Sequence, residues 1–419
     1  MNLSDRLSVL RTGFTSTFWI ANTLELFERL AFYGSKAVLA YYIANKVGLH
    51  DEAATLTGWF STLIFSLPII AGVFVDRYGF RKTLMACFGI FAVGYFSIGF
   101  AGMEWSAAIT NVVGVRNYLI FSILITAIGG SLIKPCIVGT VAKTSKPESK
   151  PLGFSIYYTL VNLGGALGPI VALNIREDLG IEYVLIMSAV TSAILFVCTF
   201  LFFKDVEPTG ETDKRTFGKV FQDMVLVFKN FRFISFLIIF SIFWLIFWQI
   251  FYLLPFYATE ILKYERFEIL ESLDALAVIL LTVPMGALLK NWKPFYVMIL
   301  GFVLASLAWF VVGAMGTTLF VIVGVLLFGL ADATQTPRFY DYVSSFAPKH
   351  QVGTFMGFAF LPVAIGSFTA GYMADWLRLT FMSSNPGMMW YVLSGLGVAG
   401  TLLVIAHHSF YSKAIERQN

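Results

Sequence analysis

The chain has 419 residues, of which 58% are hydrophobic and only 13% are charged, whereas a typical soluble protein has about 25% charged residues. This composition, with a mean hydropathy of +0.78, excludes a soluble enzyme, a disordered chain and a nucleic-acid-binding protein. The net charge of +4 comes from Lys and Arg in loops between apolar runs, which is the placement that orients a membrane protein. The three cysteines and four histidines form no metal-ligating pattern, so we expect no bound metal.

Twelve apolar stretches are long enough to cross a hydrocarbon core about 30 Å thick. Each is predicted to be a helix, because lipid offers no hydrogen bonds to the backbone. The stretches are 15–45, 54–75, 83–103, 117–143, 152–174, 181–203, 232–262, 269–289, 294–315, 317–346, 351–377 and 387–410. We therefore predict an all-α, polytopic membrane protein whose 12 transmembrane helices form two six-helix bundles.

The longest polar segment, 204–231, lies between the sixth and seventh stretches. Its second half carries phenylalanines at helical spacing beside charged residues, which is typical of an amphipathic helix on a membrane surface. The predicted domains are an N-terminal six-helix bundle at 1–203, a cytoplasmic linker with this helix at 204–231, and a C-terminal six-helix bundle at 232–419. Two six-helix halves are the organisation of many transporters.

The distribution of positive charge predicts the orientation. With the N-terminus in the cytoplasm, the inner segments hold 19 of the 29 Lys and Arg residues and the outer segments hold 6. Cytoplasmic loops carry such an excess of Lys and Arg. We expect a multi-pass protein of a bacterial inner or plasma membrane with both termini in the cytoplasm.

The first apolar stretch carries charges that are costly inside a bilayer, at about 2.5–3.5 kcal/mol each on insertion scales. At 100° per residue, Glu25, Arg29 and Lys36 fall within about 40° of one another, and Glu28 and Tyr33 flank them. Glu25 and Arg29 are four residues apart, the spacing of a helical ion pair. This stripe must face the bundle interior or a wet cavity.

The fourth stretch contains Lys134 followed by Pro135. A lysine at this depth needs a carboxylate partner or water. The proline leaves the carbonyl of Ser131 without its helical donor, so the helix can bend there. In the second half, Asp332 lies near the centre of its stretch and Asp274 near the outer end of another.

A short inner turn between the second and third stretches concentrates charge. It runs from Gly72 to Lys82 and includes the acidic and basic side chains that could lock neighbouring helix ends through ion pairs. We interpret it as a conformational latch made of Gly72, Asp76, Arg77, Gly79 and Arg81. The same charges also anchor the turn on the positive side of the membrane.

This turn resembles the loop motif of the major facilitator superfamily, G-x-x-x-D-R-x-G-R-R-K. Within that superfamily the chain resembles the proton-coupled oligopeptide transporters. The first stretch, from Glu25 to Gly34, is similar to their E-x-x-E-R motif, and Lys134-Pro135 is similar to their helix-four K-P motif. Phe154-x-x-x-Tyr158-x-x-x-Asn162 is similar to their helix-five motif.

The resemblance implies a role for each matching residue. Glu25, Glu28 and Arg29 would couple proton binding to transport. Lys134 would bind the substrate carboxylate or exchange it for a glutamate. Asn162 would bind the peptide backbone and Asp332 the substrate amino group. Lys36 stands where the family often has an arginine that closes the outer gate. The predicted pocket also includes Tyr33, Asp274 and Trp248, the last of which replaces the family's helix-seven glutamate.

The expected function is a proton-coupled symporter that imports short peptides or similar zwitterions by alternating access, at a site between the halves. The proton gradient would supply the energy, so we expect no cofactor. The expected partners are the substrate, protons and lipid, without nucleic acid, and the protein would be a monomer. Aromatic residues at 33, 157, 158, 244 and 248 could line the cavity, although aromatic side chains belong more often to the core.

Two other functions stay open. A proton-coupled antiporter that exports a drug or metabolite is one, because Gly164 to Pro169 resembles part of the helix-five motif of that group. A membrane receptor or a membrane-embedded enzyme is the other. The sequence has no nucleophile elbow, HExxH or P-loop, so we expect that it is not an enzyme.

Overall fold

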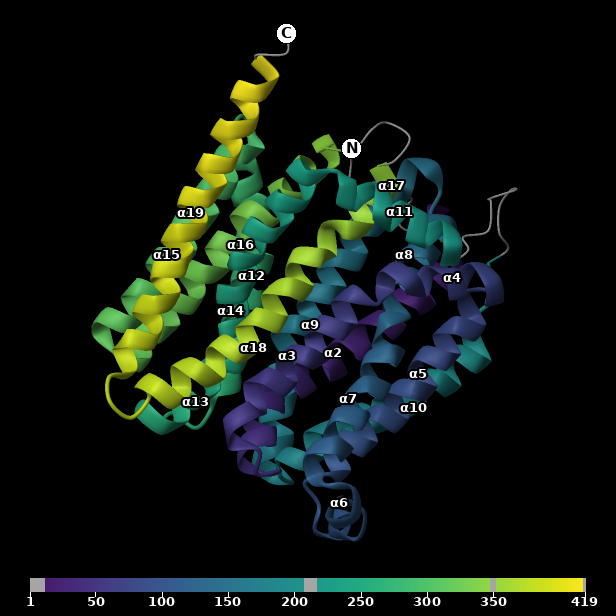
Figure 1. Cartoon of the computed structure of the whole chain (residues 1–419). Helices are drawn as coiled ribbons and strands as arrows, with labels where there is room; N and C mark the ends of the chain where they lie inside the picture. Colours follow the sequence, from purple (N-terminus) through teal and green to yellow (C-terminus); the bar gives the residue numbers. More distant parts are fainter. Residues whose placement is uncertain (1–11, 207–216, 347–351, 417–419) are drawn as a thin grey trace. The chain divides into compact units, whose positions relative to one another are not determined.

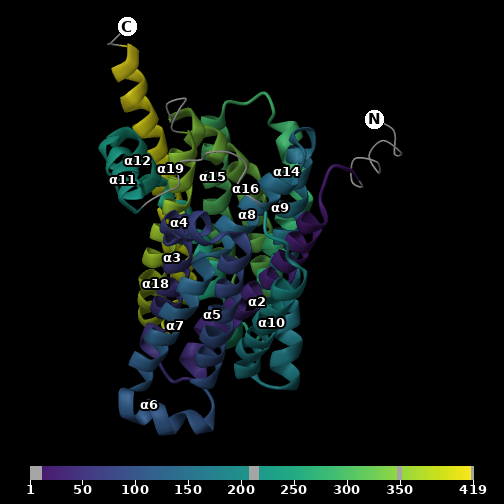
Figure 2. The same ribbon diagram turned by 90° about the vertical axis from the view of Figure 1, so that its right-hand side faces the viewer.

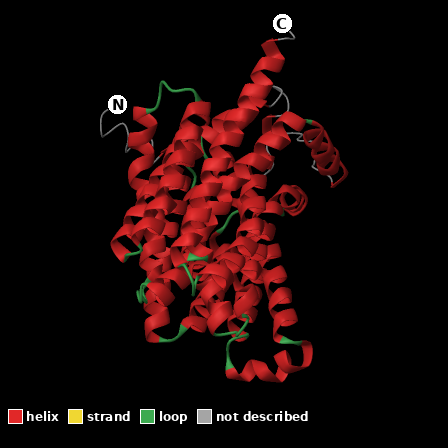
Figure 3. Cartoon of the chain, turned by 60° about the vertical axis from the view of Figure 1, so that its left-hand side comes forward, coloured by secondary structure: helices red, strands yellow, loops and turns green. Residues whose placement is uncertain are grey.

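The computed structural model describes residues 12–206, 217–346 and 352–416. Helices make up nearly all of this part of the chain (Figure 3). In the first half they are α2 (Ser16–Asn45), α3 (Ala53–Ser66), α4 (Pro68–Tyr78), α5 (Phe80–Phe100), α6 (Ala107–Val113), α7 (Val115–Ser131), α8 (Ile133–Thr144), α9 (Lys150–Asp178) and α10 (Ile181–Phe202). The predicted all-α membrane fold is confirmed.

The second half follows a linker of which 207–216 lies outside the described residues. Its helices are α11 (Phe217–Lys229), α12 (Phe231–Tyr252), α13 (Leu254–Phe256), the π-helix η4 (Tyr257–Ile261), α14 (Phe267–Leu288), α15 (Pro294–Met315), α16 (Thr318–Phe346), α17 (Val352–Gly357), α18 (Leu361–Phe381) and α19 (Pro386–Glu416). The helix predicted in the second part of the linker is present as α11.

Ten helices of the described part are long and apolar enough to cross a membrane, and eleven if one bent pair counts as a single span. The bent pair is η1–α3 with α4, which meet at 47° where Pro68 begins α4. The first predicted span is α2, 30 residues long, and its four buried charged side chains set it apart from the apolar spans. Each of the twelve predicted stretches therefore contains a helix.

The fourth predicted span also contains a break. It is split into α7 and α8 at Leu132, whose N–H bonds to the carbonyls of Gly129 and Gly130. The break precedes Pro135, which cannot donate to a helical carbonyl. Between α5 and α7 the chain forms the additional short helix α6 (Figure 2), which the hydropathy pattern does not predict.

The described helices group into two compact units. Unit 1 holds residues 1–36 and 67–220, and unit 2 holds residues 37–66 and 221–419, so the boundary falls inside α2. In unit 1, α5 packs between α7 and α10 (Figure 1). In unit 2, α18 packs against α3 and α12, and α15 packs against α16 and α19. The predicted domain limits at 203 and 232 stay a prediction.

Close backbone approach explains the packing of α3 on α18 in unit 2. A Cβ atom on Gly371 would lie 2.6 Å from the carbonyl oxygen of Ala54 and 2.9 Å from the Cα atom of Thr55. The carboxylate of Asp375 accepts hydrogen bonds from the backbone N–H groups of Ala54 and Thr55, at 3.2 and 2.8 Å. Asp375 thus caps the N-terminus of α3, where an acidic group is favoured.

This geometry predicts that Gly371→Ala destabilises the protein. The added methyl group has no room against α3, and such overpacking costs about 1–3 kcal/mol. We expect a lower thermal unfolding midpoint for the purified protein in detergent.

The matched control is Gly286→Ala in α14, because a Cβ atom there would meet nothing within 4 Å. The control should leave the midpoint unchanged or raise it. Equal midpoints for the two variants would contradict the close packing of α3 and α18.

Candidate functional site

Unit 1 contains a cluster of charged side chains in its interior. Glu25, Glu28 and Arg29 lie on α2 with exposed fractions of 0, 2 and 3%. Lys134 at the start of α8 completes the cluster, with 25% of its side chain exposed. Two acids and two bases balance one another, which is the condition under which charges tolerate burial.

Arg29 is the centre of this cluster. Its guanidinium donates two hydrogen bonds to the carboxylate of Glu28, from Nε and from Nη2, the latter at 2.7 Å. Its Nε atom also lies 3.5 Å from Oε1 of Glu25, so the predicted i,i+4 ion pair is present. The guanidinium sits over the ring of Phe32 at 4.7 Å from the ring centroid. Arg29 therefore contacts Glu25, Glu28 and Phe32 at the same time.

Glu25 is bound much more loosely than Glu28. Neither of its carboxylate oxygens has a hydrogen-bond partner among the described residues. Its contacts are the ion pair with Arg29 and a second one with Lys134, whose Nζ lies 3.9 Å from Oε1. A fully buried carboxylate without hydrogen bonds is expensive. Glu25 is thus the carboxylate of the cluster with the fewest bonds to break when it changes partner.

Lys134 bridges the charged cluster and a tyrosine. Its ammonium donates a hydrogen bond of 3.0 Å to the hydroxyl of Tyr157 on α9. The break at Leu132 begins a new helix, α8, just before Lys134. Because Lys134 is the most exposed member of the cluster, it is the group that an incoming anion could reach.

Glycines on α9 allow α2 to come this close. A Cβ atom on Gly164 would collide with Cβ of Arg29, and one on Gly168 would lie 2.9 Å from the backbone nitrogen of Gly34. Small residues permit such approach of helices in membranes. Their positions on α9 therefore fix the register of Arg29 in the bundle.

The other predicted residues of unit 1 lie nearby in sequence but make separate contacts. Asn162 donates a hydrogen bond to the carbonyl of Tyr158 in its own helix, at 2.8 Å. Lys36 is 1% exposed and its Nζ lies 5.4 Å from the ring centroid of Tyr33. Lys36 thus has an aromatic neighbour at cation–π distance.

The predicted residues of unit 2 fall into two kinds of surroundings. Asp332 on α16 is partly exposed and accepts a hydrogen bond from the hydroxyl of Thr336. Asp274 on α14 is buried. Trp248 on α12 is 1% exposed, its indole N–H donates to the carbonyl of Val363 at 3.2 Å, and its ring stacks on Tyr252. Trp248 is therefore part of the packing between α12 and α18.

The predicted latch centres on the turn between α4 and α5. Gly79 has φ of +82°, a conformation that favours glycine. The carboxylate of Asp205 accepts the N–H groups of Phe80 and Arg81 at 3.2 and 3.4 Å. Arg81 donates to the carbonyl of Phe200. The turn is thereby tied to the end of α10.

The remaining latch residues show different exposure. Asp76 and Arg77 are exposed at the end of α4, and Gly72 is partly exposed. The guanidinium of Arg77 lies 5.4 Å from the ring centroid of Tyr78.

Comparison with known proteins identifies the family. The family model "Major Facilitator Superfamily" matches residues 23–371. The chain belongs to the major facilitator superfamily. Its helices and its loop motif between α4 and α5 are thus those of a transporter family, as the sequence predicted.

Curated relatives of this major facilitator protein are peptide transporters. Dipeptide and tripeptide permease B of Xenorhabdus bovienii is 27% identical over 163 residues, which cover 37% of this chain and 31% of the relative. Peptide transporter family 1 of Drosophila melanogaster is 29% identical over 167 residues, covering 38% of this chain and 22% of the relative. The matched stretch thus spans about a third or less of these relatives.

Solved structures share the fold over almost the whole chain. A POT family transporter in complex with 5-aminolevulinic acid aligns with a TM-score of 0.76 and 16% identity, covering 93% of this chain and 95% of the other. A mutant form of the nucleoside transporter NupG also aligns with a TM-score of 0.76, at 15% identity, covering 94% of this chain and 100% of the other. Because transporters of different solutes share it, this fold does not by itself define the substrate.

Three polar residues of this major facilitator protein have roles that the sequence does not reveal. Tyr157 appears in the sequence as one aromatic among several, yet its hydroxyl holds Lys134. Asp205 lies in the charged linker and Asp375 in an apolar stretch, and both cap helices that are distant in sequence. An isolated carboxylate near the end of an apolar stretch is the only available signal for the last two.

The geometry predicts unequal costs for removing the charges on α2. Arg29→Met leaves Glu25 and Glu28 buried with Lys134 as the remaining cation of the cluster, and breaking a buried pair in this way costs about 3–5 kcal/mol. We expect a large loss of folded protein, measured by size-exclusion chromatography and thermal unfolding in detergent.

The double variant Glu28→Gln/Arg29→Met removes one acid together with the base and leaves Glu25 paired with Lys134, so it should recover much of the lost stability. If the double variant is as unstable as Arg29→Met alone, charge compensation by Arg29 is not what stabilises the cluster.

Proposed function

We propose that this protein is a proton-coupled symporter that imports short peptides or similar small zwitterionic solutes by alternating access. It would act without a cofactor and not as an enzyme, as a monomer in a bacterial inner or plasma membrane with both termini in the cytoplasm. The observation that carries the proposal is the contrast inside the buried cluster: Glu28 is fully hydrogen-bonded to Arg29, whereas Glu25 and Lys134 are held loosely.

Competition for Lys134 supplies a coupling mechanism. A substrate carboxylate that binds the ammonium of Lys134 would draw it away from Glu25, which lies 3.9 Å away. A buried carboxylate that loses a cation neighbour binds a proton more readily. Substrate binding at Lys134 and protonation of Glu25 would then favour each other, which is the linkage that a symporter needs.

Recognition of a zwitterion also needs a group for the amino end. Asp332 fits this role because it is a partly exposed carboxylate in the middle of α16, and no ion pair to it is seen among the described residues. Tyr33, Lys36, Asn162, Trp248 and Asp274 stay proposed members of the binding site. Of these, Trp248 would act mainly by shaping the site, since its N–H is already bonded to Val363.

The relatives support a peptide transporter over an exporter of a drug or metabolite. Those named above are permeases or transporters of peptides, whereas the only support for an exporter is a partial helix-five motif. The latch residues Gly72, Asp76, Arg77, Gly79 and Arg81 would serve the conformational cycle. Asp205 would take part with them, since the N–H groups at the start of α5 bond to it.

Uptake into proteoliposomes tests the coupling. An imposed inward proton gradient should drive accumulation of a labelled dipeptide by the wild type. Glu25→Gln should abolish this accumulation but keep exchange of labelled for unlabelled dipeptide without a gradient, because the substrate groups remain. Lys134→Ala should lose both activities.

Comparing gradient-driven accumulation with exchange decides whether Glu25 couples proton binding to transport. Gradient-driven accumulation that survives in Glu25→Gln would remove Glu25 from proton coupling. Absence of any dipeptide transport by a folded wild type would contradict a peptide substrate.

Blocked peptides test the two ends of the substrate separately. Wild-type binding should weaken about 10–100-fold when the amino group is acetylated, the range expected for losing a hydrogen bond to a charged group. Asp332→Asn should bind the free and the acetylated dipeptide almost equally, measured by competition with the labelled dipeptide.

The same Asp332→Asn variant should still discriminate against a dipeptide whose carboxyl end is amidated, since Lys134 is intact. Unchanged discrimination against the acetylated peptide in Asp332→Asn would assign the amino group to another residue.

A further inference from the structure

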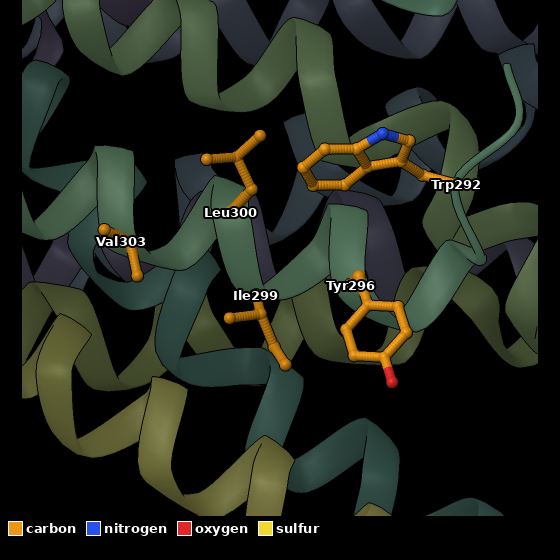
Figure 4. Close-up of a pocket in the computed structure, with 5 residues that line it drawn as sticks. All are labelled: Trp292, Tyr296, Ile299, Leu300 and Val303. Atoms are coloured by element: carbon orange, nitrogen blue, oxygen red, sulfur yellow. The ribbon is translucent and has the colours of Figure 1, made fainter. Parts of the chain in front are cut away.

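Unit 2 carries a shallow apolar groove on α15. The groove has a volume of about 500 Å³, and it is lined by Trp292, Tyr296, Ile299, Leu300 and Val303 (Figure 4). Tyr296, Ile299, Leu300 and Val303 lie along one face of α15, because residues three and four apart share a helix face. Trp292 lies in the turn before the helix. Trp292, Tyr296 and Val303 are 50, 54 and 46% exposed, whereas Val297, Met298 and Phe302 on the opposite face are fully buried. Since α15 is long and apolar enough to cross a membrane, we infer that this exposed apolar face contacts lipid.

Basic side chains stand at one end of this groove. Lys290 and Lys293 are both exposed and flank Trp292 in the α14–α15 turn. The segment from Leu288 to Tyr296 contains no acidic residue. His408 of α19 stacks on Phe295, which follows Lys293 and Pro294, with 3.8 Å between ring centroids. Positive charge therefore gathers where the apolar groove begins.

The turn that carries the two lysines is held in place. Arg338 of α16 donates a hydrogen bond of 3.1 Å to the carbonyl of Leu289 and forms an ion pair with Asp341 at 3.4 Å. The same carbonyl accepts the N–H of Trp292 at 3.0 Å. A site whose backbone is ordered before binding loses little entropy when a ligand arrives.

We propose that this groove binds a phospholipid with a net negative headgroup. One acyl chain would lie along Tyr296, Leu300 and Val303, and the phosphate would lie between Lys290 and Lys293. Trp292 and Tyr296 would sit at headgroup level, where such aromatic residues concentrate. The turn lies on the side that the positive-inside rule assigns to the cytoplasm, whose leaflet carries anionic lipids.

Binding of phosphatidylglycerol to the purified full-length protein tests the proposal, with phosphatidylcholine of the same acyl chains for comparison. Native mass spectrometry counts the lipids retained on the protein. Each lysine should contribute about fivefold, so Lys290→Gln/Lys293→Gln should weaken phosphatidylglycerol binding about 25-fold. The matched control, Lys146→Gln/Lys150→Gln, removes two exposed lysines of unit 1 and should leave binding unchanged.

A second variant separates the groove from the charges. Leu300→Trp fills the groove and keeps both lysines, and it should also reduce phosphatidylglycerol retention. Equal retention of the two lipids by the wild type would show only non-specific lipid contact and overturn the proposal. So would competition by inorganic phosphate combined with normal binding in Leu300→Trp, which would indicate a free-anion site. Neither outcome depends on whether the protein transports peptides.

Discussion

The ion pair between Arg29 and Glu28 is the interaction on which unit 1 depends. Four charged groups lie inside an apolar bundle, where each alone would cost several kcal/mol. Arg29 reduces that cost because its planar guanidinium can bind Glu28 with two hydrogen bonds and still reach Glu25. Lysine, a single charged centre, could not make the same paired contact. The glycines of α9 follow from this arrangement, since a larger residue at 164 would displace Arg29.

In unit 2, the buried polar groups that need partners are backbone N–H groups. The N-terminal N–H groups of α3 need acceptors, and Asp375 of α18 supplies both of its oxygens. Farther along the same pair of helices, the hydroxyl of Ser367 donates to the carbonyl of Gly58 at 3.1 Å. The hydroxyl of Tyr252, on α12, donates to Ser61 of α3 at 2.9 Å. Such contacts need helices at close range, which explains Gly371 in α18. Polar contacts and glycines thus act together.

Much of the fold could be predicted from the sequence, because apolar stretches of membrane length leave few alternatives to a helix. The Glu25–Arg29 pair was predictable too, since i,i+4 neighbours share a helix face. The tighter Glu28–Arg29 contact was not, because adjacent residues do not face each other on a helix. This contact forms because both side chains are buried, so that each charge must be solvated by the other and not by water. The Lys134–Tyr157 bond joins α8 to α9. Pro135 indicates that the helix can bend before it, but no local pattern specifies which side chain of α9 Lys134 contacts.

The sequence likewise does not specify what the side chain of Trp248 contacts. Its position in a motif predicts a pocket residue, but a motif does not say which way a side chain points. The structure places the indole in the packing between α12 and α18, so its effect on a substrate would be indirect. For Asp332, in contrast, the residues alone indicate a costly charge near the centre of a span and the resemblance implies a contact with the substrate amino group. The structure adds that the group is partly exposed.

Hydrogen bonding separates the buried charges that stabilise the fold from those available for chemistry. Asp375 and Glu28 have both carboxylate oxygens engaged. Such groups resist change, because any movement would leave a buried charge without partners. Glu25 has no hydrogen bond among the described residues, and Lys134 donates its hydrogen bond to the neutral hydroxyl of Tyr157. The energy needed to change partners is smallest for these two, so a transport cycle that moves charge inside unit 1 would begin with them.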